Sequence, residues 1–332
     1  MAIDIARRKF IAALGGSAMA WPLAARAQQA GPTVRIGFLG PTTPKGSVAL
    51  DGFEAFRDQL HTLGLSEGPV ISINYKYIDD PRGLGVVTAE LMQTRPDIIV
   101  ATGTETALQV ALAAKRGVPI VMVAVNFDPI ARGYAGSLSR PGGDITGVVF
   151  QQLELAQKQV EILTQAFPDR KKLAVLFDAQ SADQFAAAEG AAKSLNLQVQ
   201  PLKLENSPYD FEAAFRSAAA ASAQMVLVLS SPLFAPQSAR IAELAIAGRL
   251  PTMFIFKNYV EVGGLMSYGV DFPLMYRRAA DDVAKIAKGA KPADLPIERA
   301  DKFEFAVNLK TAKALGVKLP TGILLRADVV IE

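Results

Sequence analysis

Residues 97–125 read DIIVATGTETALQVALAAKRGVPIVMVAV, and this stretch predicts how the chain folds. Two apolar runs, Asp97–Ala101 and Pro119–Val125, flank a segment of helical composition. Neither run alternates with polar residues, which is expected of parallel strands that helices cover on both faces. A strand, a helix and a second strand at this spacing form a βαβ unit, and repeated units build a parallel sheet.

The same rhythm extends along the chain in both directions, in two sets of similar length and element order. Within each set, an amphipathic stretch follows each apolar run. We therefore predict an α/β protein with two similar lobes rather than one large sheet. The further strands of the first set are Val34–Leu39, Val70–Tyr77 and Ile145–Phe150; those of the second set are Leu173–Asp178, Leu197–Leu204, Met225–Leu229, Thr252–Phe256 and Leu265–Val270.

The first 27 residues have the order of an export signal. An Arg7-Arg8 pair starts it, an apolar stretch covers Ile11–Leu23, and Ala25-Arg26-Ala27 offers small residues to a signal peptidase. The apolar stretch is too short to span a bilayer. We predict that residues 1–27 are a removed signal of the twin-arginine type, with the general secretory route as the alternative. The mature chain would begin at Gln28 and work in the periplasm.

Charge and composition exclude several classes of function. Removal of residues 1–27 takes away four basic and one acidic side chain and leaves 31 of each, so the basic balance gives no argument for nucleic-acid binding. The chain has no cysteine and one histidine, His61, which disfavours thiol catalysis, Ser-His triads and multi-His metal sites. We therefore expect no catalysis, no cofactor and no metal. The length predicts two domains, at roughly 150 residues each.

The loops that follow the predicted strands are the candidate site, because ligands of open parallel sheets bind beyond the carboxyl ends of the strands. In Thr102-Gly103-Thr104, the last residue has a hydroxyl and a backbone N–H that suit an anionic group at a helix N-terminus. An ordinary threonine cap is the alternative. Further along, Ser181-Ala182-Asp183-Gln184 matches a capping box.

Several stretches match a known family: Ser139-Arg140-Pro141-Gly142-Gly143-Asp144-Ile145-Thr146-Gly147-Val148, then Val260-Glu261-Val262-Gly263-Gly264-Leu265, and near the end Asn308-Leu309-Lys310-Thr311-Ala312-Lys313-Ala314-Leu315-Gly316. On these motifs, nearly the whole chain resembles the substrate-binding proteins of ABC transporters, in the group that includes tryptophan/tyrosine-binding receptors. The resemblance implies the type I periplasmic-binding fold: two Rossmann-like α/β lobes with parallel sheets, joined by a hinge of crossing strands, that close over a solute without catalysis.

The resemblance also implies a division of the chain and a set of cleft residues. Lobe 1 is expected to comprise residues 32–148 plus about 265–290, and lobe 2 residues 149–264 plus about 300–332. Asp128 precedes Pro129, and Asp271 precedes a predicted helix, so each has capping as its alternative role. The candidate ligand-binding residues lie in loops that match the family: Thr42, Thr43, Gly103, Thr104, Asn126, Asp128, Gln151, Asp178, Ser230, Ser231, Tyr268 and Asp271.

The sequence and the resemblance together predict a periplasmic solute-binding receptor of an ABC importer. Its solute is expected to be small and organic: an amino acid, an aromatic acid or another small carboxylate. Its expected partners are that solute and a membrane permease, with no nucleic acid, and we expect a monomer that is not embedded in the membrane. Two alternatives remain: a ligand-sensing module for a membrane kinase or chemoreceptor, and an exported α/β enzyme.

Overall fold

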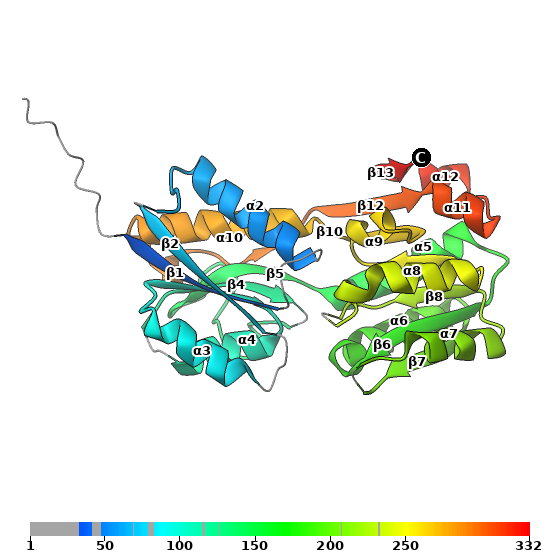
Figure 1. The fold of residues 1–332 in the computed structure, drawn as a ribbon, viewed down its shortest axis with the longest axis horizontal. Helices are drawn as coiled ribbons and strands as arrows, with labels where there is room; N and C mark the ends of the chain where they lie inside the picture. The colour runs from blue at the N-terminus through cyan, green and yellow to red at the C-terminus, as the bar shows by residue number, and fades with distance from the viewer. Residues whose placement is uncertain are drawn as a thin grey trace, which may run out of the picture.

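The computed structural model describes residues 33–41, 48–68, 70–78, 83–114, 117–125, 127–206, 208–231 and 233–332. Within them the chain forms two lobes that lie side by side, each built on its own sheet (Figure 1). This is the α/β architecture that the sequence predicts. The predicted export signal, residues 1–27, lies outside the described residues.

The first lobe contains a sheet that, within the described residues, has six strands in the order β11-β5-β4-β3-β1-β2, with all pairs parallel. In β3 of this sheet, Ile98 and Val100 pack with α2 and α10, whereas Ile99 and Ala101 pack with α3 and α4. Both faces of the strand are buried, which explains its unbroken apolar run. The elements are β1 Val34–Pro41, α2 Val48–Thr62, β2 Ile71–Ile78, α3 Leu84–Gln93, β3 Ile98–Gly103, α4 Glu105–Ala114, β4 Ile120–Val125, β5 Ile145–Phe150, α10 Phe272–Ala287 and β11 Glu298–Arg299.

The second lobe contains a sheet of seven described strands, β13-β12-β10-β9-β8-β6-β7, in which only the β10–β12 pair is antiparallel. Helices α5, α6, α11 and α12 cover one face, and α7, α8 and α9 cover the other. The elements are α5 Gln152–Ala166, β6 Lys172–Asp178, α6 Ala182–Ser194, β7 Gln198–Leu204, α7 Phe211–Ala220, β8 Met225–Val228, α8 Ser238–Ala247, β9 Thr252–Phe254, α9 Lys257–Glu261, β10 Met266–Val270, β12 Phe303–Asn308, α11 Leu309–Leu315, α12 Thr321–Leu324 and β13 Val329–Ile331.

All ten strands predicted from the sequence are present, with ends that differ by at most two residues. Three further strands, β11, β12 and β13, were not predicted. β11 has two residues and β13 has three, too few to carry a periodic signal. β12 shows no alternation, because one exposed and one half-buried residue are followed by four buried ones.

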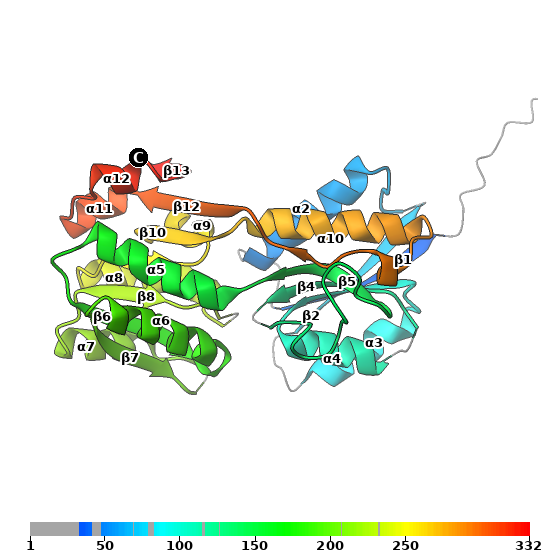
Figure 2. The same ribbon diagram turned by 180° about the vertical axis from the view of Figure 1, so that it is seen from behind.

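The described chain passes between the lobes three times. It crosses from β5 to α5 at Gln151, from β10 to α10 at Asp271, and from β11 to β12 through residues 300–302 (Figure 2). The crossings are bonded to one another: the backbone N–H of Ala300 donates to Val149 O at 2.9 Å, and that of Asp271 donates to Lys302 O at 3.1 Å. The three segments therefore form one narrow connection.

The predicted division placed residues 265–290 together in lobe 1, and the sheet pairing corrects this in one place. β10 pairs with β9 and β12 in the seven-stranded sheet, whereas α10 packs against α2 and the six-stranded sheet. The chain changes lobe at Asp271, between a buried strand and an amphipathic helix, and not at residue 265. The rest of the predicted division stays a prediction.

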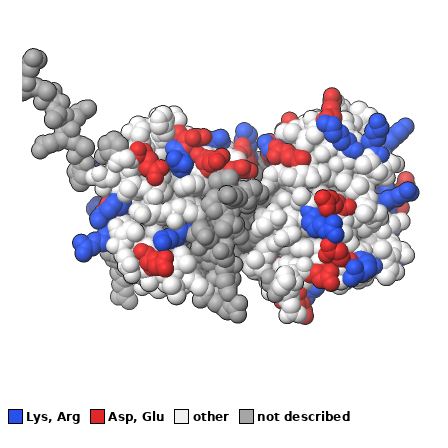
Figure 3. Space-filling view, in the orientation of Figure 1, with Lys and Arg blue, Asp and Glu red and all other residues white. Residues whose placement is uncertain are grey.

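The surface of the described chain is of mixed charge. Figure 3 shows acidic and basic side chains next to one another over the lobe that carries α7 and α8. Pairs there include Arg240 with Glu212, at 2.6 Å between Nη2 and Oε1. No helix in the described part of the chain is long and apolar enough to cross a membrane.

Gly147 in β5 offers a test of the first sheet. Its φ is +131°, and a Cβ added there would lie 2.0 Å from Met122 O in the neighbouring strand. We expect Gly147→Ala to lower the free energy of unfolding by about 3 kcal/mol, because the backbone conformation and the strand spacing both oppose a side chain. The matched control is Gly190→Ala in the exposed face of α6, where a Cβ meets nothing within 4 Å. Better helix propensity should there raise stability by about 0.5–1 kcal/mol. Urea unfolding measures both, and equal effects would contradict the strand contact.

Candidate functional site

A cavity of about 320 Å³ lies between the lobes, next to the β5–α5 crossing. We call it the crevice. The first lobe contributes the loop after β4 and the end of β5, and the second contributes the first turns of α5 and α6 and the turn between β6 and α6. Its lining residues are Phe127, Asp128, Phe150, Gln151, Gln152, Leu153, Glu154, Gln180, Asp183 and Gln184.

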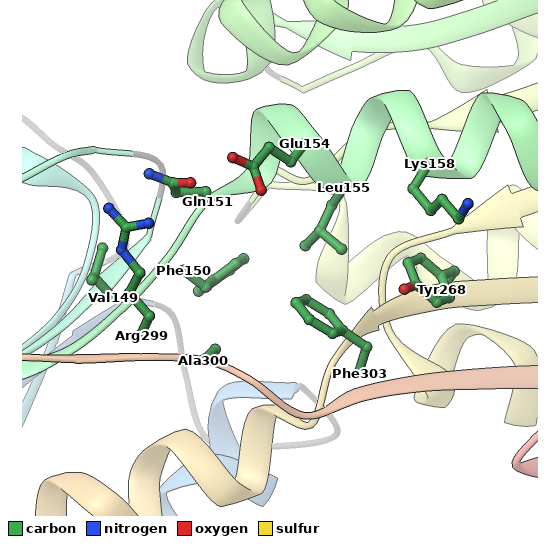
Figure 4. Close-up of a pocket in the computed structure, with 10 residues that line it drawn as sticks. All are labelled: Val149, Phe150, Gln151, Glu154, Leu155, Lys158, Tyr268, Arg299, Ala300 and Phe303. Atoms are coloured by element: carbon green, nitrogen blue, oxygen red, sulfur yellow. The ribbon is translucent and has the colours of Figure 1, made fainter.

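Two further cavities flank the crossings. One of about 300 Å³, which we call the crossover pocket, lies between the β5–α5 and β11–β12 segments (Figure 4). It shares Phe150, Gln151 and Glu154 with the crevice. The other, of about 450 Å³, lies where Asp51 of α2 approaches α9 and the start of α10. Both volumes fall within the range of small-molecule sites.

Of the predicted site residues in the first lobe, some lie outside the described residues, and the others differ in whether they line the crevice. Thr42, Thr43 and Asn126 lie outside the described residues. Asp128 lines the crevice, and its Oδ1 also accepts from the backbone N–H of Ile130 at 2.8 Å. The capping role that the sequence left open for Asp128 is therefore present.

Gly103 is the last residue of β3 and Thr104 follows it, and neither lines the crevice. Gly103 has φ +101°, which favours glycine. The Thr104 hydroxyl makes no hydrogen bond with the described residues, so the side-chain cap that the sequence left open as its alternative role is not formed. The adjacent Glu105 instead accepts from the Tyr134 hydroxyl at 2.8 Å and pairs with Arg132 at 3.2 Å.

In the second lobe, Asp178 is fully buried and saturated with hydrogen bonds. Its carboxylate accepts from the hydroxyls of Ser231 and Tyr209 and from the backbone N–H of Gln180 and Ser181. Asp178 and Ser181 together form the capping box of the turn after β6. The predicted box of Ser181 with Gln184 is wrong, because Ser181 already serves Asp178 and makes no cap bond to α6.

Ser230 belongs to a buried amide network that faces the crevice. Gln184 donates from Nε2 to Ser230 O and accepts from Ser230 N, at 3.2 and 3.1 Å. Gln152 donates from Nε2 to Ser230 Oγ at 3.1 Å. Ser231 is thus bonded to Asp178, and Ser230 to the two glutamines, so both serine residues support this loop.

The remaining predicted residues lie at the crossings. Gln151 lines both the crevice and the crossover pocket. Tyr268 lines the crossover pocket and stacks on Phe303 with ring centroids 6.0 Å apart (Figure 4). Asp271 caps α10 by accepting from Leu274 N at 3.0 Å, its predicted alternative role, and it pairs with Lys302 at 3.5 Å. Ligand binding by these residues stays a prediction.

Sequence reasoning missed Gln152, Asp183 and Gln184 as crevice residues. One signal was available: two glutamines follow the buried strand β5 directly, at a predicted lobe boundary. The other two were assigned to helix capping, which concealed their position at the start of α6. Among the described residues, no three His, Cys, Asp or Glu side chains gather in a way that could hold a metal ion.

A substitution at Asp178 tests the hydrogen bonds of the loop after β6. Burial, together with the Asp178 carboxylate, raises the pKa of Tyr209 to about 12. Because the folded pKa exceeds the unfolded value near 10, this group's contribution to stability is complete below pH ~10 and is lost as the pH rises toward 12. Asp178→Asn should lower the pKa of Tyr209, which stays above ~10 through burial, and reduce the free energy of unfolding by about 1–3 kcal/mol.

An NMR titration of labelled tyrosine and urea unfolding at neutral pH measure the two effects. Asp210→Asn is the control, because Asp210 is exposed beside Tyr209 and caps α7 without contacting the phenol. An unchanged Tyr209 pKa in Asp178→Asn would contradict the network.

Comparison with known proteins supplies the family. The family model "ABC transporter substrate binding protein" matches residues 48–331. A tyrosine-binding protein of Clostridioides difficile (strain R20291) is 23% identical over 269 residues, which are 80% of this chain and 76% of that protein.

Two solved structures have a similar fold. A conserved domain protein of Vibrio cholerae has a TM-score of 0.80 at 21% identity, over 90% of this chain and all of that one. An ABC domain in complex with L-Trp from Streptococcus pneumonia has a TM-score of 0.77 at 23% identity, again over 90% of this chain and all of that one. Because the family model matches residues of both lobes, the chain belongs to the substrate-binding proteins of ABC transporters.

Proposed function

We propose that the protein is a periplasmic receptor of an ABC importer that captures a small organic solute between its lobes. The observation that carries this proposal is the crevice, which takes residues from both lobes and adjoins the crossing segments. A solute there contacts both lobes at once. The family match supports the role in import, and the predicted export signal supports the periplasmic location.

Capture follows from the way the lobes are joined. Narrow connections let two rigid bodies turn relative to each other, as in hinge closure around a ligand. A solute shifts the balance toward the closed form only by binding that form more tightly. In the crevice, Asp128 and Phe127 come from one lobe and Gln180 and Asp183 from the other, so closure adds contacts that the open form lacks.

The solute class is an amino acid, with an aromatic one favoured, or a related aromatic acid or small carboxylate. The relatives named for tyrosine binding and solved with L-Trp support this class. In this chain Phe127 and Phe150 line the crevice and offer flat apolar walls to a ring. A volume of about 320 Å³ suits a molecule of that size.

The receptor releases its solute unchanged to a membrane permease. The single histidine, His61, is exposed at the end of α2 and lies apart from the crevice. The crevice lining itself consists of carboxylates, amides and apolar groups. These groups bind and orient a solute without providing a nucleophile that is paired with a base.

Thermal unfolding of the chain from Gln28 onward, with and without solutes, tests the proposal. L-tryptophan or L-tyrosine should stabilise the protein by an amount that rises with the logarithm of the free solute concentration and reaches about 2.7 kcal/mol at 100 times Kd. Leu153→Arg should abolish the effect by filling the crevice, whereas Val262→Arg should not, although both side chains are 47% exposed. Stabilisation by sugars alone would contradict the solute class. Stabilisation by no solute of any class would contradict the receptor function.

A further inference from the structure

We propose that the crevice selects solutes that carry a protonated amine beside an apolar body. Asp128 and Asp183 hold the amine from opposite lobes, and Gln152 offers a hydrogen-bond acceptor at the floor. The inference rests on the proposed function and narrows its solute class, because acids without an amine would be rejected.

The charges that line the crevice have one sign. Its described lining includes three carboxylates, Asp128, Glu154 and Asp183, and neither a lysine nor an arginine. Asp183 forms no ion pair with the described residues. The cation nearest to Asp128 in sequence, Arg132, is paired with Glu105 at 3.2 Å.

Glu154 differs from the two aspartates in its position. It lies between the crevice and the crossover pocket and lines both. Figure 4 shows Arg299 at the same end of the crossover pocket as Gln151 and Glu154. Because Glu154 shares the crossover pocket with a guanidinium, the proposal assigns the selection to Asp128 and Asp183, which line the crevice alone.

Gln152 gives an independent indication of a polar ligand group. Its side chain is 2% exposed and lines the crevice. Nε2 donates to Ser230 Oγ, but Oε1 has no hydrogen-bond partner among the described residues. A buried acceptor without a donor destabilises a fold, so a donor supplied by the solute would remove that cost. An ammonium group has three N–H donors, enough for Oε1 and for both aspartates.

Apolar side chains of the crevice lining can pack against the apolar half of the solute. Phe127 and Phe150 are buried at the crevice, and Leu153 is about half exposed there. A ring or alkyl chain placed against these side chains leaves water, which stabilises the complex in proportion to the area buried.

Like charges on the two lobes also make closure depend on the solute. Closing the empty crevice brings Asp128 toward Asp183, and two carboxylates at short distance repel each other. An ammonium group between them reverses the sign of that interaction. The amine therefore binds the closed form more tightly than the open form, which is the condition for ligand-driven closure.

Calorimetric titration with L-tryptophan, tryptamine and indole-3-propionate separates the two charged ends of one solute. The amino acid and the amine should bind, and the deaminated acid should bind about 100-fold more weakly, about 2.7 kcal/mol. Asp183→Asn and Asp128→Asn should each weaken tryptamine binding about 10-fold, and Asn at 128 retains the cap acceptor. Asp169→Asn, exposed in the turn before β6 at the far end of the strands, should leave affinity unchanged. Melting of each variant without solute checks that it folds.

Equal or tighter binding of indole-3-propionate would overturn the inference, because Gln152 would then present its amide nitrogen to a carboxylate. Unchanged tryptamine affinity in both aspartate variants would also overturn it. If none of the three indoles binds while an uncharged solute does, the receptor function stands and the inference fails. If no solute binds at all, both fail.

Discussion

The structure depends on the hydrogen bonds that tie the three crossings of the described chain together. Ala300 N bonds to Val149 O, and Asp271 N bonds to Lys302 O, so segments from distant parts of the chain share one connection. Arg278 of α10 reinforces it, because its guanidinium donates to Arg299 O and to Asp301 Oδ1 at 3.2 and 2.6 Å. Each lobe keeps its own sheet, and Leu155, Ile255 and Val270 of the second lobe pack into the core of the first across the joint.

The position of the crevice follows from that arrangement. Parallel strands direct their carboxyl ends toward the same edge of a sheet, and the loops after β4 and β6 meet beside the β5–α5 crossing. The loop after β6 keeps its shape through buried polar bonds centred on Asp178, so that Gln180 and Asp183 are presented from a fixed base. In the proposed function these loops hold the solute from opposite lobes, and the family membership is consistent with that use.

The sequence predicted the part of the fold that depends on burial. Unbroken apolar runs such as Ile98-Ile99-Val100 need cover on both faces, which places helices around parallel strands. It missed β11, because two residues carry no period, and the antiparallel return of β12. For the site, it identified the loops but not the roles within them. Asp178 and Ser231 satisfy each other, and Gln152 gains its importance from Ser230, 78 residues away, a pairing that no local pattern records.

The distance between the lobes, measured as solute is added, tests the account most directly. The chain has no cysteine, so Ala89→Cys on α3 and Ser217→Cys on α7, both exposed, give a unique pair of labels on different lobes. Both helices lie on the side away from β12 (Figure 1), where a rotation about the crossings moves them most. Pulsed electron paramagnetic resonance should show a shorter, narrower distance distribution with bound solute. A distribution unchanged at saturation would contradict a clamp that closes on its ligand.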